Sequence, residues 1–237
     1  MKRSQINSLI RSATRCFGAH HWALPSNARW DITDFGLGDW RRFGLVLVNL
    51  ADEPEYCEKL MYAQKGMITP AHAHKKKKED IICRQGKLAV QVWAGEPAKN
   101  AGQSLRIAVN HEGREVSSGA IIELEAGSRV TLVPGVYHEF YSLSDECIIG
   151  EVSTANDDLH DNFFVNPDVG CYPGVEEDEP PIFASGGVKI VEIGWFENRC
   201  IRGRIPVKRR CASPWLQKKN GGRRYFDGSR VKKMAVL

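Results

Sequence analysis

The sequence of 237 residues contains no run of about 18 apolar residues, which excludes a membrane-spanning helix. Its first residues, MKRSQINSLIRSATRCFGAHH, carry charges throughout and lack an apolar core, so secretion by a signal peptide is not expected. Cysteine occurs only seven times, widely spaced and without a CxxC pair, which argues against a disulfide framework or a cysteine zinc knuckle. We therefore expect reduced thiols in a cytoplasmic protein.

The net charge is small, but it is unevenly distributed. The total of +4 is too weak to indicate nucleic acid or an anionic membrane as a partner. Residues 1–184 hold 19 basic and 26 acidic residues, whereas residues 185–237 hold 14 basic and only three acidic ones. This shift predicts a domain boundary near residue 184. Three interpretations of the basic tail, 185–237, remain open: it is disordered, a small added element or a non-native extension. Within the tail, Lys189–Phe196 has the pattern of a strand.

The remaining composition predicts a mainly β protein with one helix at its start. Apolar residues recur at helical spacing at Ile6, Leu9, Ile10, Ala13 and Phe17. Pro25 ends this pattern, and residues 29–42 are expected to form a loop. The predicted strands that follow are Gly44–Leu50, Glu58–Gln64, Glu79–Gln85, Lys87–Trp93, Gly119–Leu124, Ser128–Val133, His138–Ser142 and Cys147–Ser153. Many short strands with Gly and Pro turns favour a sandwich or barrel.

Residues 66–86 and a later histidine carry the residue types of a metal site. His72 and His74 are one residue apart, so on an extended strand both side chains lie on the same side and can bind one cation. Glu79 follows a run of four lysines and could add a carboxylate oxygen. His138 begins another predicted strand after a Pro-Gly turn. Three nitrogens and one oxygen suit Mn²⁺, Fe²⁺, Co²⁺, Ni²⁺ or Zn²⁺ and leave positions for water or substrate.

This arrangement resembles the cupin superfamily. Residues 66–86 match its first motif, G-x₅-H-x-H-x₃₋₄-E-x₆-G, at every fixed position. The second motif, PxGxxH with an Asn four residues later, matches less well, because Pro134 adjoins Gly135 and Ser142 takes the place of the Asn. The resemblance implies a cupin barrel, which is a double-stranded β-helix or jelly roll, with an N-terminal helical extension. It also implies one metal bound by His72, His74, Glu79 and His138.

Residues 1 to about 180 are similar to the D-lyxose isomerase family of cupins. Long matching segments include EYCEKLMYAQKGMITPAHAHKKKKEDIICRQG and DNFFVNPDVGCYPGVEEDEPP, and nothing after residue 184 fits the family. The family implies a cytoplasmic homodimer that uses a divalent metal, Mn²⁺ foremost. It interconverts free D-lyxose with D-xylulose and D-mannose with D-fructose. The implied partner is therefore a monosaccharide, with no role for a membrane or nucleic acid.

Five further residues are candidates for the chemistry of such a reaction. Glu151 alternates with apolar residues on an otherwise apolar strand, so we expect it to point inward as the base; the alternative is an ion pair with a buried lysine. Lys59 is expected to point inward as its electrostatic partner, with an exposed lysine as the alternative. Lys77 either turns inward to bind substrate oxygens or belongs to a solvated loop. Asp157 and Asp158 are expected to bind sugar hydroxyls at the rim.

Two other classes of function stay open at this point. An Fe²⁺ cupin dioxygenase would use the same ligands, would consume oxygen and would need no carboxylate to relay protons. The pair of Glu151 and Lys59 therefore favours the isomerase. A non-catalytic cupin that binds sugar or metal, with its tail on nucleic acid, would bind without turnover and with a steep salt dependence.

Overall fold

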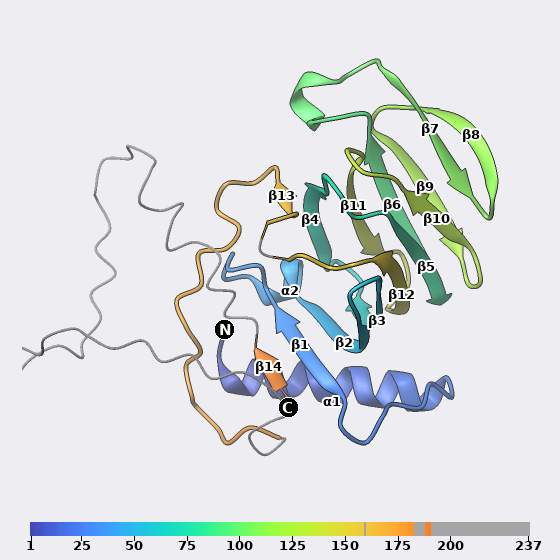
Figure 1. Ribbon diagram of the computed structural model, residues 1–237. Coiled ribbons are helices and arrows are strands. Elements are labelled where there is room, and N and C mark those ends of the chain that lie inside the picture. The colour runs from blue at the N-terminus through green and yellow to red at the C-terminus, as the bar shows by residue number, and fades with distance from the viewer. Residues whose placement is uncertain (159, 183–187, 191–237) are drawn as a thin grey trace, which may run out of the picture. The chain divides into compact units, whose positions relative to one another are not determined.

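Two mainly antiparallel sheets form the body of the protein in a computed structural model that describes residues 1–158, 160–182 and 188–190. The elements are α1 (Arg3–Ala19), β1 (Arg29–Thr33), α2 (Trp40–Phe43), β2 (Leu45–Asp52), β3 (Tyr56–Gln64), β4 (Ile68–Ala73), β5 (Glu79–Gln85), β6 (Lys87–Trp93), a 3₁₀ turn (Pro97–Lys99), β7 (Ser104–Val109), β8 (Glu112–Ser117), β9 (Ala120–Glu125), β10 (Arg129–Leu132), β11 (Tyr137–Ser142), β12 (Glu146–Thr154), β13 (Phe163–Phe164) and β14 (Val188–Ile190). The sheet orders are β14-β1-β2-β3-β12-β5-β10-β7-β8 and β13-β4-β11-β6-β9 (Figure 1). Successive strands such as β4, β5 and β6 alternate between the sheets, as in a jelly roll.

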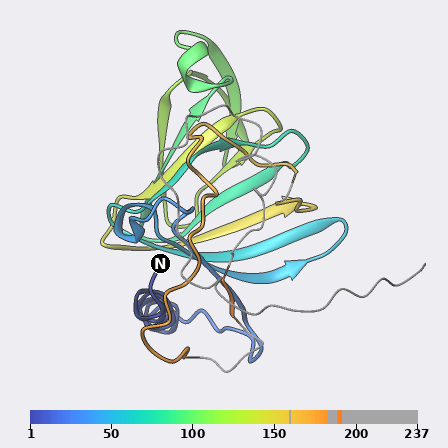
Figure 2. The ribbon, with the colours of Figure 1, turned by 90° about the vertical axis from the view of Figure 1, so that its left-hand side faces the viewer.

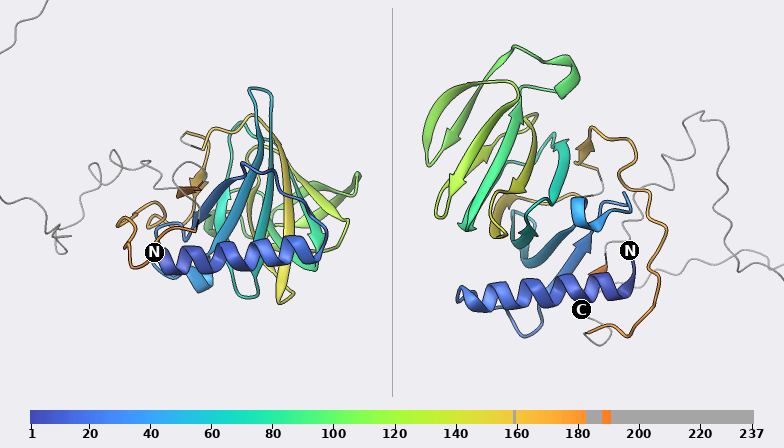
Figure 3. Two further views of the ribbon diagram at one scale, coloured as in Figure 1. Left: turned by 90° about the horizontal axis from the view of Figure 1, so that it is seen from below. Right: turned by 180° about the vertical axis from the view of Figure 1, so that it is seen from behind.

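Helix α1 packs on the outer face of the nine-stranded sheet at the part formed by β1, β2, β3 and β12, as Figures 2 and 3 show from the side and from below. The five residues of its predicted apolar stripe are all buried, which confirms the predicted helix. The ring of Phe17 packs 6.4 Å from that of Tyr62 on β3 and 6.3 Å from that of Trp30 on β1, measured between centroids. The helix already ends at Ala19, ahead of the proline expected to stop it.

All eight predicted strands are present, with boundaries shifted by at most two residues. The loop expected over 29–42 is wrong, because it contains β1 and α2. Only five residues form β1, which is too short a stretch for its alternation to stand out in a Trp- and Asp-rich context. The hairpin of β7 and β8 was also not predicted, since β8, Glu112–Ser117, is an almost wholly exposed edge strand without an apolar face.

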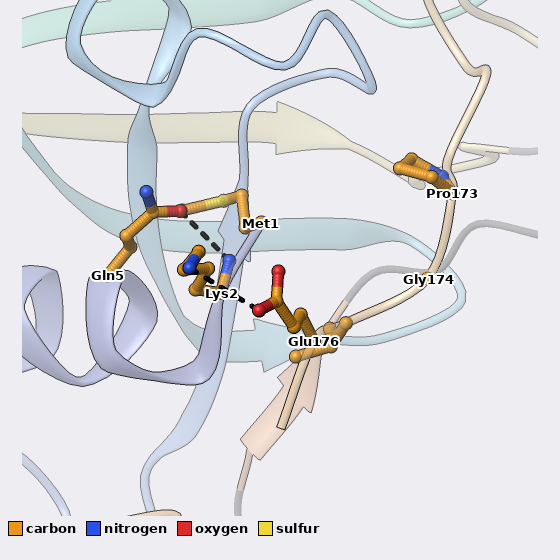
Figure 4. A pocket seen from close by; sticks show the side chains of 7 residues that line it. Met1, Lys2, Gln5, Pro173, Gly174 and Glu176 are labelled. Carbon is orange, nitrogen blue, oxygen red and sulfur yellow. Dashed lines mark hydrogen bonds and ion pairs between the residues drawn. The ribbon is translucent and has the colours of Figure 1, made fainter. Parts of the chain in front are cut away.

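The acidic segment Glu176–Glu179 runs along the N-terminal half of α1 and binds it through four successive side chains. The pairs are Lys2–Glu176 (3.3 Å), Arg3–Glu177 (2.8 Å), Ser4–Asp178 (2.8 Å) and Asn7–Glu179 (2.6 Å). Figure 4 shows the first of these pairs at a shallow pocket between the start of the helix and residues 173–176. The segment that follows β13 is therefore joined to the first helix of the chain.

The boundary predicted near residue 184 and most of the basic tail lie outside the described residues. Within the tail the backbone of β14 pairs in parallel with β1, with Val188 opposite Trp30 and Ile190 opposite Ile32. In the described part of the chain, no helix combines the length and the apolar character that a membrane crossing requires. Cys16, Cys57, Cys83 and Cys147 are buried there, and Cys171 is exposed.

Candidate metal centre

The four candidate ligands predicted from the sequence come together inside the barrel. They are His72 on β4, His74 directly after it, Glu79 at the start of β5 and His138 on β11. One nitrogen or oxygen atom from each lies within 4.8 Å of the others, and all four residues are buried. The pairing of β4 with β11 sets His72 opposite His138, whereas Glu79 comes from the other sheet. A group of this composition could hold a metal ion.

Each imidazole is oriented by a backbone carbonyl. The Nδ1 atoms of His72, His74 and His138 lie 2.8 Å, 2.8 Å and 3.2 Å from the carbonyl oxygens of Pro70, Asp161 and Val136. A carbonyl oxygen only accepts, so each Nδ1 carries a proton, and in a neutral ring Nε2 is then the nitrogen with the lone pair. Histidines that bind metals are commonly held in this way, which directs Nε2 towards the ion.

The remaining polar atoms of this group fit a cation. The Nε2 atoms of His74 and His138 and the Oε1 atom of Glu79 are buried and have no hydrogen-bond partner in the described structure. Glu79 Oε1 lies 3.3 Å from His74 Nε2 and 2.9 Å from His138 Nε2, so acceptor atoms face one another. Burial, together with the neighbouring His138 and His74, holds the pKa of His72 well below its ordinary value, which keeps that ring neutral. Such an arrangement of lone pairs is costly unless a positive ion lies between them.

Next to this group lies a network of buried charges. Lys77 Nζ is 2.8 Å from Glu79 Oε2 and 3.0 Å from Glu151 Oε1. Lys59 on β3 stands directly opposite Glu151 on β12, with Nζ 3.2 Å from the same Oε1 atom. Lys59, Lys77 and Glu151 are all nearly inaccessible to solvent. Glu151 thus points inward, as expected, and it also has the ion pairs of the alternative interpretation.

The two lysines keep both carboxyl groups ionised. Burial alone would raise the pKa of Glu151, but the charges of Lys59 and then Lys77 lower it below its ordinary value. Burial would likewise raise the pKa of Glu79, and Lys77 is the strongest of the neighbours that hold it well below its usual range. The network is therefore two cations facing two carboxylates in a buried space.

The predicted solvated loop is correct for three of the four lysines in the run 75–78. Lys77 turns inward, whereas the other three are exposed.

The two aspartates predicted at the rim lie nearer the surface than Lys77 does. Asp157 is half-buried, and its Oδ1 lies 3.0 Å from Nδ1 of the exposed His160. Asp158 is half-buried too. Burial would lower the pKa of Lys59, and the charge of Asp158 assists that of Glu151 in raising it instead.

Sequence reasoning missed Asp161 and Asn156, which follow β12. The buried Asp161 accepts hydrogen bonds from the backbone of Lys75–Lys77, and Asn156 Oδ1 lies 3.5 Å from Lys59 Nζ. Their one signal is a stretch rich in Asn and Asp. The ring of Phe164 on β13, which pairs with β4, lies 5.1 Å from the ring of His72.

Sequence comparisons find relatives along most of this chain. The sequence profile of the family described as D-lyxose isomerase matches residues 26–185. The D-lyxose/D-mannose isomerase of Escherichia coli O157:H7 is 31% identical, over 76% of this chain and 94% of its own length. The D-lyxose ketol-isomerase of Cohnella laeviribosi is 30% identical, over 63% of this chain and 82% of its own length.

Solved structures share the fold at low sequence identity. An L-ribose isomerase of Acinetobacter sp. DL28, in complex with L-ribose, superimposes with a TM-score of 0.57 at 17% identity, over 74% of this chain and 98% of its own. The L-ribose isomerase of Geodermatophilus obscurus gives 0.56 at 14% identity, with the same coverage of both chains. These likenesses support a shared fold, that of the cupin-type sugar isomerases.

Proposed function

The chain belongs to the D-lyxose isomerase family of aldose–ketose isomerases, and from that premise we propose that it interconverts free D-lyxose with D-xylulose and D-mannose with D-fructose at the buried His72-His74-Glu79-His138 group. The observation that carries this proposal is the set of unpartnered Nε2 and Oε1 atoms in that group, next to the ionised Glu151.

One divalent ion, Mn²⁺ foremost, would be held by the three Nε2 atoms and by Glu79 Oε1, with Zn²⁺, Co²⁺, Fe²⁺ or Ni²⁺ also acceptable to this donor set. When bound, such an ion supplies Lewis-acid polarisation of the sugar oxygens and stabilises negative charge on them. Lys77 holds the second oxygen of Glu79, which leaves Oε1 to face the imidazoles of His74 and His138.

Glu151 is proposed as the base that moves the proton between C2 and C1. Its carboxylate accepts the proton from one carbon, which leaves an enediolate, and returns it to the other carbon. A second proton passes between O1 and O2, so the sugar keeps its atoms and its oxidation state. Because its pKa is lowered, Glu151 is ionised at neutral pH, which is the form that a base requires. The Lys59 ammonium, 3.2 Å from Glu151, stabilises the negative charge that develops beside it.

The charge balance of the site supports free sugars over sugar phosphates as substrates. Lys59 and Lys77 are both paired with Glu151, and Lys77 is also paired with Glu79. These two buried cations therefore offer little uncompensated charge to a phosphate group. At the rim, Asp157 and Asp158 are half-buried, and we propose that they bind sugar hydroxyls.

Three wider features stay proposals that follow from the family. Residues 1–184 form the functional domain, which accords with a family match that stops at residue 185. The protein acts as a homodimer. It works in the cytoplasm, where free monosaccharides are its partners.

Replacing Glu151 tests the proposed chemistry. We expect Glu151→Gln to lower isomerase turnover on D-lyxose and D-mannose by about 10²-fold or more, because an amide cannot take up the proton. Glu58→Gln is the matched control, since Glu58 is the neighbour of Lys59 on β3 and points to the opposite face of the sheet. Turnover is measured with Mn²⁺ present, after metal analysis of each protein. Undiminished turnover in a metal-loaded Glu151→Gln protein would contradict the role of Glu151, and oxygen uptake would favour a dioxygenase.

A further inference from the structure

Asp161 is a buried acidic residue, 3% exposed, in the segment that follows the last long strand, β12. Its Oδ1 accepts the backbone N–H of Lys75 at 2.9 Å and that of Lys76 at 3.0 Å. Its Oδ2 accepts the N–H of Lys76 at 3.1 Å and that of Lys77 at 2.8 Å. Both oxygens are thus used to hold three consecutive amides of the loop between β4 and β5.

The same residue also contacts a candidate metal ligand. Its backbone carbonyl oxygen lies 2.8 Å from His74 Nδ1, which orients that imidazole. His74 precedes the three bound amides, and Glu79 follows them. Asp161 therefore holds the loop that joins two ligands and, through its own main chain, one of those ligands.

We propose that Asp161 is a positioning residue of the metal centre, whose carboxylate fixes the Lys75–Lys77 backbone so that His74 and Lys77 are held in the geometry that binds the metal. The inference rests on the proposed metal site and is independent of which sugar is converted. A residue that only stabilised the loop would affect unfolding. A positioning residue has a further effect: loss of its carboxylate weakens metal binding at temperatures where the protein remains folded.

The physical reason is that the three amides have one shared acceptor group. Without it they must bond to water, which favours an open loop. Opening the loop withdraws Lys77 from Glu79 and Glu151, and it separates His74 from the carbonyl that sets its orientation. Residues that orient metal ligands are typically worth about 10- to 100-fold in metal affinity.

Two carboxylates of this chain make the experiment selective. Asp161→Asn keeps the size of the side chain, but one of its two acceptor atoms becomes a donor. Asp178→Asn is the matched control, because Asp178 also uses both oxygens, on the backbone N–H and the hydroxyl of Ser4, away from the metal centre. Mn²⁺ affinity is measured by calorimetric titration of the full-length proteins, and Co²⁺ absorption spectra report the ligand geometry.

We expect Asp161→Asn to bind Mn²⁺ about 10- to 100-fold more weakly than the wild type, with an altered Co²⁺ spectrum. Asp178→Asn should match the wild type in both measurements. In a His74→Gln background, Asp161→Asn should cause a smaller further loss than in the wild type, because one of the two residues that it positions is already absent. Wild-type affinity and spectrum in Asp161→Asn, or an equal loss in both backgrounds, would overturn the proposal.

Hydrogen exchange of the wild type gives a test that requires no variant to fold. Coupling is reciprocal, so if the hydrogen bonds between Asp161 and the Lys75–Lys77 amides favour metal binding, then metal binding must stabilise those hydrogen bonds. The amides of Lys75–Lys77 should exchange more slowly when Zn²⁺ is added, whereas the Ser4 amide held by Asp178 should not change. Unchanged exchange in protein that demonstrably binds Zn²⁺ contradicts the positioning role alone. A wild type that binds neither Mn²⁺ nor Zn²⁺ overturns the metal site as well.

Discussion

Lys77 joins two carboxylates that would otherwise repel each other in a buried space. Its ammonium contacts Glu79 at 2.8 Å and Glu151 at 3.0 Å, and all three side chains are at most 7% exposed. Coulomb energies are larger in such surroundings than in water, so the removal of one member of the network has a large effect. The residue thereby links a candidate metal ligand to the proposed base.

Replacing this lysine should destabilise the metal-free protein. We expect Lys77→Met to lower the free energy of unfolding by about 3–5 kcal/mol, because it leaves Glu79 without its lysine partner in a buried space and leaves Glu151 with Lys59 alone. Lys76→Met, at an exposed neighbouring position, should change it by less than about 0.5 kcal/mol. Both values come from urea unfolding followed by circular dichroism. Equal stability of the two variants would show that the network is weakly coupled to the fold.

Local spacing predicted which histidines share one side of a strand, whereas long-range contacts could not be predicted from the sequence. His72 and His74 could be assigned to one side of a strand because strand alternation is a property of neighbouring residues. Glu151 and Lys59 were expected to point inward for the same reason. Asp161 could not be found, because its bonds to Lys75–Lys77 join residues more than 80 positions apart. Nothing in the local pattern around Asp161 indicates which amides it will meet.

At the scale of elements, α1 and the nine-stranded sheet depend on each other. The helix places its apolar stripe on the outer face of the sheet, and the acidic segment Glu176–Glu179 holds its N-terminal half. The stripe was predictable from its 3.6-residue period. The role of the acidic segment was not, since a run of charges more often forms a solvated surface, and its partners on α1 are about 170 residues away.

A substitution that creates a cavity between α1 and the sheet tests this packing. Phe17→Ala is expected to lower the free energy of unfolding by about 3–5 kcal/mol, because it removes a fully buried ring from between Trp30 and Tyr62. Thr14→Ala, on the exposed side of the same helix, should have little effect. Urea unfolding measures both variants, and Mn²⁺ titration should give the wild-type affinity for each, since neither residue contacts the candidate ligands. A small loss for Phe17→Ala would mean that the helix is loosely attached.

At the scale of the whole molecule, the total charge of +4 is the sum of an acidic part and a basic part. The body, with 26 acidic and 19 basic residues, is acidic, which suits an enzyme for neutral sugars. Any attraction to polyanions depends on residues 185–237. Every residue assigned to the metal centre or to its chemistry lies before residue 165.

Truncation should separate the two parts. A chain that ends at Ala184 is expected to keep Mn²⁺ affinity and isomerase turnover within about twofold of the full-length protein, because it retains all of these residues and nearly all of the paired strands. A chain that ends at Ile190 retains β14 as well, so the difference in thermal unfolding between the two truncated proteins measures what β14 adds to β1. Collapse of activity and stability in both would show that the tail is part of the enzyme.

The contacts of the acidic segment with α1 also determine the order in which the molecule can be completed. The ribosome makes α1 first, and the ion pair of Arg3 with Glu177 can form only after the whole barrel between them has been synthesised. Likewise, His74 lacks its orienting carbonyl until residue 161 has emerged. Contacts this far apart in sequence form late and slow the final steps of folding. A nascent chain can therefore form hairpins early, but the candidate metal ligands and the contacts of α1 are complete only when the last residues of the domain have been made.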